Sequence, residues 1–141
     1  MKKLFFGSIE NANSADLALA LLRVFVGLSL MLVHGSGKIP VSDGFIEHIG
    51  SLGFPMPAIF AWAAALAEYI GALLLALGLF TRPAALMVAF TMFVAAVVNH
   101  GTDPFAVAEK AYLYLSISLL FVVLGSGRFG VDSIIRRKLN I

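Results

Sequence analysis

The feature that most constrains the fold is a continuous apolar run over residues 58–80, which contains a single charged side chain, the carboxylate Glu68. An α-helix rises about 1.5 Å per residue, so about 20 apolar residues cross a hydrocarbon core of about 30 Å. This run is long enough to do so. Because 60% of the 141 residues are hydrophobic and the mean hydropathy is +0.97, the sequence predicts an integral membrane protein rather than a soluble domain.

Three further apolar runs complete the predicted topology. We expect membrane-spanning helices at about residues 17–35, 58–80, 83–100 and 105–125. Residues 41–52 are too short and too polar to cross, but their apolar side chains share one helical face, which indicates a short helix in the membrane interface; an irregular loop is the alternative. The predicted fold is all-α, a polytopic membrane four-helix bundle formed by one domain over residues 1–141.

The distribution of basic residues predicts the orientation of this bundle. They concentrate on the side that holds both termini and the connection between the second and third spans: Lys2, Lys3, Arg82, Arg128, Arg136, Arg137 and Lys138. Under the positive-inside rule, both termini are expected in the cytoplasm. The tail over residues 126–141 is then a basic segment on the cytoplasmic membrane surface.

Several classes of site are not expected. The chain has no cysteine, which removes disulfides, thiolate metal sites and any persulfide chemistry by this chain itself. Its net charge is only +2 and its basic residues are not interleaved with aromatic ones, so we expect no nucleic-acid binding. The three histidines, His34, His48 and His100, lack the close spacing of metal ligands, and no metal site is predicted.

The carboxylate Glu68 needs a partner, because a charge near the bilayer centre costs about 2.5–3.5 kcal/mol on insertion scales. Arg23 is the only other charged residue well inside a span. If the first span starts at Leu17 and the second ends at Phe80, the two backbones differ in depth by about 9 Å, which two long side chains can cover. We therefore expect an ion pair between Arg23 and Glu68, which serves either as a proton relay or only to fix helix register.

A polar stripe indicates a ligand pocket. Arg23 and His34 lie along one line of the first helix, and Lys38 continues it if the helix extends that far. Asn99 and His100 end the third span at the same membrane side. These side chains outline a pocket between helices that opens outward, with His34, Lys38, Asn99 and His100 as candidate ligand-binding residues. The alternative is that these polar side chains only form hydrogen bonds between helices and hold the bundle together.

Taken together, these motifs resemble the DoxX family of small four-span membrane proteins of bacteria and archaea. The similarity covers about residues 17–135 and is carried by Arg23-x-x-x-Gly27, His34-Gly35-x-x-Lys38, the sequence SLGFPMP over residues 51–57, and Glu68-x-x-Gly71 followed by Gly78-Leu79-Phe80-Thr81-Arg82-Pro83-Ala84. The resemblance implies residence in the cytoplasmic (inner) membrane and places Arg23, Lys38 and Glu68 at the family's polar motif positions.

The resemblance also implies a redox setting. Some family members resemble subunits of thiosulfate:quinone oxidoreductase, and others accompany membrane complexes that handle redox stress. We therefore expect a membrane subunit of an oxidoreductase system that binds a quinone-like or similar small ligand, with a partner oxidoreductase subunit and with homo-oligomerisation as a further option. The alternatives are a non-catalytic scaffold that stabilises a partner enzyme and a carrier for a small solute.

Overall fold

The computed structural model describes residues 12–140 and confirms the all-α, four-span prediction. Its four helices of membrane length are Asn13–Lys38, Pro57–Leu77, Thr81–Asn99 and Phe105–Leu124. No strand occurs within residues 12–140. Large apolar side chains cover much of the surface, as expected where lipid replaces water: Leu21, Phe25, Val33 and Val123 are each more than 60% exposed.

The first three spans each contain a segment of wider, π-helical winding, and the fourth is regular. The elements in chain order are α2 (Ala12–Ser29), η1 (Leu30–Gly35), η2 (Ser36–Lys38), α3 (Asp43–Ser51), α4 (Pro57–Leu66), η3 (Ala67–Gly71), α5 (Ala72–Leu77), α6 (Thr81–Phe93), η4 (Val94–Asn99), α7 (Phe105–Leu124) and α8 (Val131–Leu139). The π-helical segments are η1, η3 and η4.

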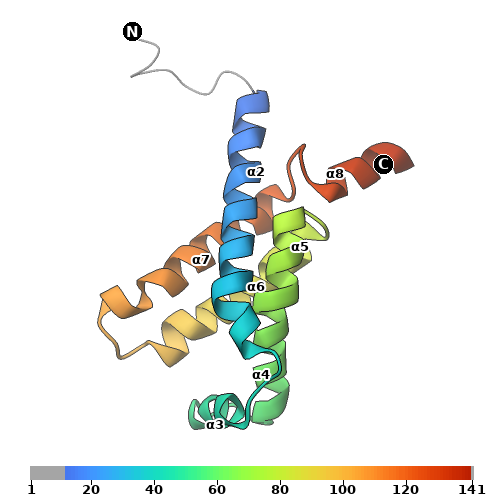
Figure 1. Cartoon of the computed structure of the whole chain (residues 1–141). Coiled ribbons are helices and arrows are strands. Elements are labelled where there is room, and N and C mark those ends of the chain that lie inside the picture. Colours follow the sequence, from blue (N-terminus) through green and yellow to red (C-terminus); the bar gives the residue numbers. More distant parts are fainter. Residues whose placement is uncertain (1–11, 141) are drawn as a thin grey trace.

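The spans pack as two antiparallel pairs that are inclined to each other (Figure 1). In the first pair, α2 contacts α5 and η1 contacts η3; in the second, α6 contacts α7. The pairs join where α6 packs against η3 and α5. The start of α2 and helix α8 lie at one end of the bundle, called the α8 end below, and α3 lies at the opposite α3 end (Figure 1).

Two glycines set the register of the first pair. A Cβ at Gly27 would lie 2.6 Å from the carbonyl oxygen of Ala72, and a Cβ at Gly35 would lie 2.5 Å from that of Glu68. Small residues in membrane helices allow such close backbone approach, and the resulting van der Waals contact replaces the hydrophobic driving force that lipid removes. Ala61, Ala65 and Ala72 are likewise fully buried.

The helix ends differ from the predicted bounds by a few residues. The first span does not stop at Gly35 but continues through η2 to Lys38, because Gly35 retains a helical backbone and serves as a close-packing residue. The second span ends at Leu77, where Gly78 adopts a left-handed conformation with φ +69°, which glycine tolerates without strain. The third helix begins at Thr81, two residues before Pro83.

The helix expected over residues 41–52 is present as α3. Ser42 caps it by accepting a hydrogen bond from the Phe45 amide at 3.3 Å. Its residue Ile49 is buried, and α3 packs on α4. The apolar face of α3 therefore turns toward the bundle.

The basic tail contains a helix that the sequence did not predict, α8, and Asp132 holds it in place. The Asp132 carboxylate accepts hydrogen bonds from the amides of Phe80 and Thr81 and from the Thr81 hydroxyl, at 2.7–2.9 Å. The Asp132 amide donates to the carbonyl of Gly78 at 2.8 Å. Asp132 thus caps helix α6 from a distant part of the chain.

The charge of Asp132 is stabilised by this arrangement. Burial by itself raises the pKa of the Asp132 carboxyl, but the hydrogen bonds from Thr81 and Phe80 and the positive charge of Arg136 outweigh burial. The pKa therefore lies below its ordinary value.

Replacing Asp132 by alanine is expected to release α8 and to cost about 1–2 kcal/mol, the usual range for a lost N-cap. A carboxyl with a lowered pKa stabilises the fold fully above its unfolded value, near pH 4, and this contribution is lost as the pH falls through the folded-state pKa. Hydrogen exchange of the amides in α8 measures the release. Asp16→Ala, at the same end, is the control; equal exchange in both variants would contradict the cap.

Candidate functional site

The central feature of the site is an ion pair between Lys38 and Glu68. Lys38 Nζ lies 2.6 Å from each carboxylate oxygen of Glu68. The side chain of Glu68 is 4% exposed and that of Lys38 is 29% exposed. Lys38 Nζ also lies 5.2 Å from the centroid of the Phe45 ring, a favourable cation–π distance. The charge of the Glu68 carboxylate is thereby balanced by the Lys38 ammonium, and Lys38 also borders an open space inside the bundle.

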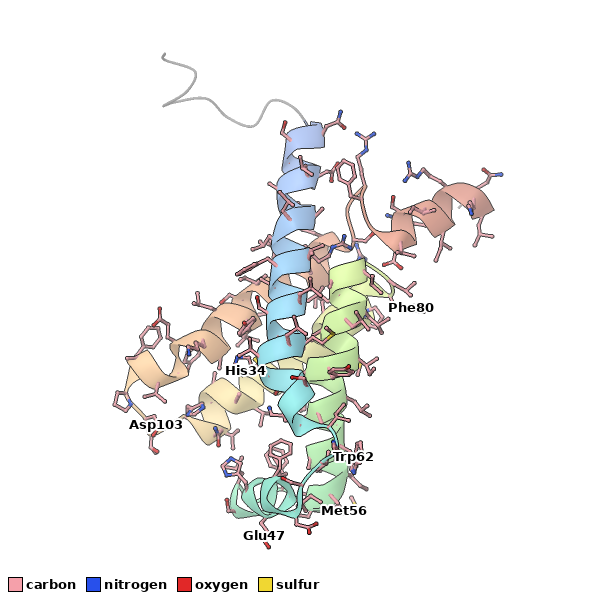
Figure 2. All side chains as sticks on the ribbon, in the orientation of Figure 1. His34, Glu47, Met56, Trp62, Phe80 and Asp103 are labelled. Atoms are coloured by element: carbon pink, nitrogen blue, oxygen red, sulfur yellow. The ribbon has the colours of Figure 1, made fainter. Side chains whose placement is uncertain are left out.

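That open space is a cavity of about 210 Å³ toward the α3 end, between the two helix pairs. It holds five of the six site residues expected from the sequence: His34, Lys38, Glu68, Asn99 and His100. Its other walls are Leu30, Met92, Ala95, Val107, Lys110, Ala111 and Tyr114. The His34 ring meets the Tyr114 ring edge-on at 5.8 Å between centroids, and His34 faces the junction of the helix pairs (Figure 2). The cavity combines the Lys38–Glu68 ion pair and Lys110 with uncharged polar and histidine side chains that can form hydrogen bonds.

The three π-helical segments converge on this cavity. Leu30 and His34 come from η1, Glu68 from η3, and Ala95 and Asn99 from η4. A π-helical turn carries an extra residue, which widens the backbone and re-aims the side chains that follow; such turns are frequent at functional sites. Their coincidence in three neighbouring spans marks this level of the bundle as the candidate functional site.

A chain of hydrogen bonds leads from the α3 end to the cavity. Asn99 Oδ1 lies 2.7 Å from His48 Nε2, and Asn99 Nδ2 lies 3.0 Å from His100 Nε2. His100 Nδ1 lies 2.8 Å from a carboxylate oxygen of Asp103. Because the Asn99 amide nitrogen can only donate, His100 Nε2 accepts and His100 Nδ1 carries the proton that it donates to Asp103. The Asn99 oxygen accepts from His48 Nε2.

A second cavity also adjoins the ion pair, and a third adjoins the second. The second, of about 90 Å³, is lined by Lys38, Glu68, Asn99 and residues of α3 that include Phe45 and His48. The third, of about 160 Å³, is almost wholly apolar and shares four lining residues with it. These shared residues are Ile49, Ala64, Thr91 and Val94. The Lys38–Glu68 pair therefore lines both the polar cavity and the small cavity, and the small cavity leads on to an apolar groove.

The predicted ion pair between Arg23 and Glu68 is wrong. Arg23 lies beside Gly78, at the other end of the first helix pair, where a Cβ on Gly78 would overlap its Nη1. Glu68 lies beside Gly35, and 12 residues of helix separate Arg23 from Gly35, or about 18 Å of rise. Arg23 is 1% exposed, and its Nε and Nη1 have no hydrogen-bond partner among the described residues. Asp132 supplies a nearby opposite charge.

Sequence reasoning missed three residues of the site. None of His48, Tyr114 and Lys110 was among the candidate residues. Phe45, His48, Ile49 and Leu52 have the spacing of one helical face. From this spacing, His48 could have been predicted to face the bundle together with the three apolar residues. Within residues 12–140, no three His, Cys, Asp or Glu side chains gather as a metal site requires.

Replacing Asn99 by alanine is expected to separate His48 from His100 and to loosen α3 from the bundle. In the intact protein, ¹⁵N chemical shifts of the ring nitrogens should report His100 as the Nδ1–H tautomer at neutral pH. In Asn99→Ala the Nε2 acceptor bond is gone and the tautomers should mix. Thr102→Ala, in the adjoining turn, serves as the control. An unchanged His100 tautomer in Asn99→Ala would contradict the chain of hydrogen bonds.

Comparison with known proteins gives a consistent family assignment. A family model described as DoxX matches residues 18–101. CatD of Bacillus subtilis, which is named only provisionally as an oxidoreductase, is 33% identical over 121 residues, or 85% of this chain and 88% of CatD. The inner membrane protein YphA of Escherichia coli is 37% identical over 82 residues, 58% of each chain. An uncharacterized protein of Haemophilus influenzae is 34% identical over 125 residues, or 82% of this chain and 88% of that protein. No solved structure is significantly similar.

Proposed function

Because the chain belongs to the DoxX family, we propose that it is the membrane subunit of an oxidoreductase system and binds a quinone-like ligand. It is a multi-pass membrane protein with four apolar helices. The ligand head occupies the cavity of about 210 Å³ beside Lys38 and Glu68. We further propose that the α8 end faces the cytoplasm, since basic side chains concentrate there, so that the cavity opens to the outer face.

The observation that carries this proposal is the Lys38–Glu68 pair, in which the buried Glu68 holds a cation that lines a cavity with further hydrogen-bonding side chains. The carbonyl oxygens of a quinone accept hydrogen bonds, and Lys38 Nζ and His34 are groups that can donate them. The adjoining apolar groove, lined by side chains such as Phe54, Phe60 and Phe90, suits an apolar substituent and gives the ligand a route from the lipid phase.

The proposed redox step divides the work between this chain and its partner. Reduction of a quinone to a quinol takes two electrons and two protons. The partner oxidoreductase subunit supplies the electrons. This chain supplies the two protons to the quinone oxygens. The Lys38 ammonium, held by Glu68, gives one, and His100 gives the other and takes a proton from water through Asp103. Asp103 is 43% exposed and therefore exchanges protons with water.

Equilibrium binding of a short-chain ubiquinone analogue to the purified protein tests the proposal. We expect saturable binding that weakens about tenfold in Glu68→Gln and in Lys38→Met, the effect of losing one charged hydrogen bond. Glu109→Gln makes the same chemical change on an exposed residue outside the cavity and should leave the affinity unchanged. Absence of saturable binding in the parent protein would refute the proposal and favour the scaffold alternative.

A further inference from the structure

A cavity of about 510 Å³ lies at the α8 end and is lined by two arginines, one described acid and several apolar residues. It lies between the turn before α6, the end of α7 and helix α8. Arg82 and Arg136 bring two positive charges to it, and both side chains are exposed. The remaining walls include the apolar residues Leu79, Phe80, Pro83, Leu124 and Ile135. The cavity is therefore cationic on one part of its surface and apolar on another.

Both arginines have donors to spare. Arg82 donates from Nη2 to the carbonyl oxygen of Val123 at 3.1 Å, which anchors it at the end of α7. A guanidinium has five N–H donors, so most of those of Arg82 are not used by any residue that the structure describes. The guanidinium of Arg136 makes no hydrogen bond to another described residue. Guanidinium groups bind phosphate oxygens in paired, directional hydrogen bonds.

The one acid in the cavity, Asp132, positions an arginine rather than competing for the ligand. Its carboxylate already accepts three hydrogen bonds from Phe80 and Thr81. Those bonds also occupy the start of α6, so the ligand is held by the arginines and not by that helix terminus. Because Asp132 and Arg136 are four residues apart on α8, they share a face. Docking of Asp132 therefore turns Arg136 toward the cavity.

The charge of the whole α8 end favours an anion. Within residues 12–140 this end carries the basic residues Arg23, Arg82, Arg128, Arg136, Arg137 and Lys138 against the acids Asp16 and Asp132. The α3 end has the opposite balance, with Asp43, Glu47, Glu68, Asp103 and Glu109 against Lys38 and Lys110. Glu47 and Phe80, labelled in Figure 2, lie at these two opposite ends.

We propose that this cavity binds the phosphodiester head group of an anionic phospholipid. The phosphate lies between Arg82 and Arg136, and the acyl chains descend along the exposed side chains of Phe80 and Val123, which are 65% and 72% exposed. The apolar walls distinguish this ligand from a free anion. The proposal is independent of the quinone site, which lies toward the other end of the bundle.

The test uses the full chain in phosphatidylcholine nanodiscs that contain a small fraction of spin-labelled lipid. The immobilised fraction of spin-labelled phosphatidylglycerol, relative to spin-labelled phosphatidylcholine, gives the selectivity. We expect a several-fold preference for phosphatidylglycerol, which falls to near unity in Arg136→Gln or Arg82→Gln because each variant removes a guanidinium that hydrogen-bonds the phosphate. Asp132→Ala should also reduce it, since α8 is released while both arginines remain.

The matched control is Lys138→Gln, which removes the same charge from α8 outside the cavity and should leave most of the preference intact. Equal association of the two lipids with the parent protein would overturn the proposal. So would an equal loss in Lys138→Gln and Arg136→Gln, which would indicate general surface attraction. Displacement of the labelled lipid by millimolar inorganic phosphate would show a free-anion site and would overturn it as well.

Discussion

Replacing Lys38 by methionine is expected to lower the free energy of unfolding by about 3 kcal/mol, because it leaves Glu68 buried without its cation. This figure is the lower end of the range for breaking a buried ion pair, chosen because the Lys38 side chain retains 29% exposure. The double variant Lys38→Met, Glu68→Leu removes both charges and should recover much of the loss. Unfolding of the detergent-folded protein by titration with a denaturing detergent measures each step.

The same measurement distinguishes the two candidate partners of Glu68. A double-mutant cycle of Lys38→Met with Glu68→Leu should show strong coupling between the two changes. A cycle of Arg23→Met with Glu68→Leu should be additive within about 0.5 kcal/mol, as expected for sites that share no contact. Additivity in the first cycle, or strong coupling in the second, would show that Arg23 and not Lys38 holds the carboxylate.

Replacing Gly35 by alanine is the second change with a large expected effect. The new Cβ would lie 2.5 Å from the carbonyl oxygen of Glu68 and 2.8 Å from the Cα of Tyr69. These are backbone atoms and cannot rotate away, so η1 and η3 must separate. Overpacking of this kind typically costs about 1–3 kcal/mol. The displacement also draws Lys38 from Glu68, so ligand affinity should fall together with stability.

Gly37 provides a control two residues away for the Gly35 substitution. A Cβ at Gly37 would meet nothing within 4 Å, so Gly37→Ala should leave stability unchanged or raise it by about 0.5–1 kcal/mol through the lower flexibility of the unfolded chain. Equal stability of the two alanine variants, measured by the same detergent titration, would show that close approach of η1 and η3 is not required.

The topology follows from the sequence because each span is a long apolar run and lipid leaves the backbone few alternatives to a helix. The cavity was also predictable in outline. From the polar line on the first span and the polar end of the third, His34, Lys38, Asn99 and His100 were predicted to share a pocket with Glu68. All five residues line one cavity in the structure. What these patterns could not supply was the relative depth of the first two helices.

The relative depth of the first two spans is fixed by close contacts between their backbones rather than by where the helices end. The expected pairing of Arg23 with Glu68 assumed that the first span starts at Leu17, that the second ends at Phe80, and that these two residues lie at the same depth. The close contacts of Gly27 with Ala72 and of Gly35 with Glu68 set a different register. Because the helix continues to Lys38, the Lys38 ammonium lies beside the Glu68 carboxylate. The sequence alone does not distinguish a glycine that packs closely against a neighbouring helix from a glycine that ends a helix.

Two other features depend wholly on tertiary structure. The π-helical segments have no compositional signature, since their extra residue is accommodated by packing against neighbouring helices. Helix α8 is held by hydrogen bonds from Phe80 and Thr81 to Asp132, more than 50 residues apart in sequence. Neither hydropathy nor periodicity reports such a contact.

Photoaffinity labelling tests the central claim most directly. The purified protein is irradiated with an azido-substituted quinone, and the modified residues are identified by mass spectrometry. A ligand head beside Lys38 and Glu68 predicts labels in η1, η4 and the first half of α7. These labels should be suppressed by excess unlabelled quinone and, at subsaturating azidoquinone, much weaker in Glu68→Gln. Labels confined to lipid-facing side chains such as Phe25 and Val123, with no effect of competitor, would contradict the account.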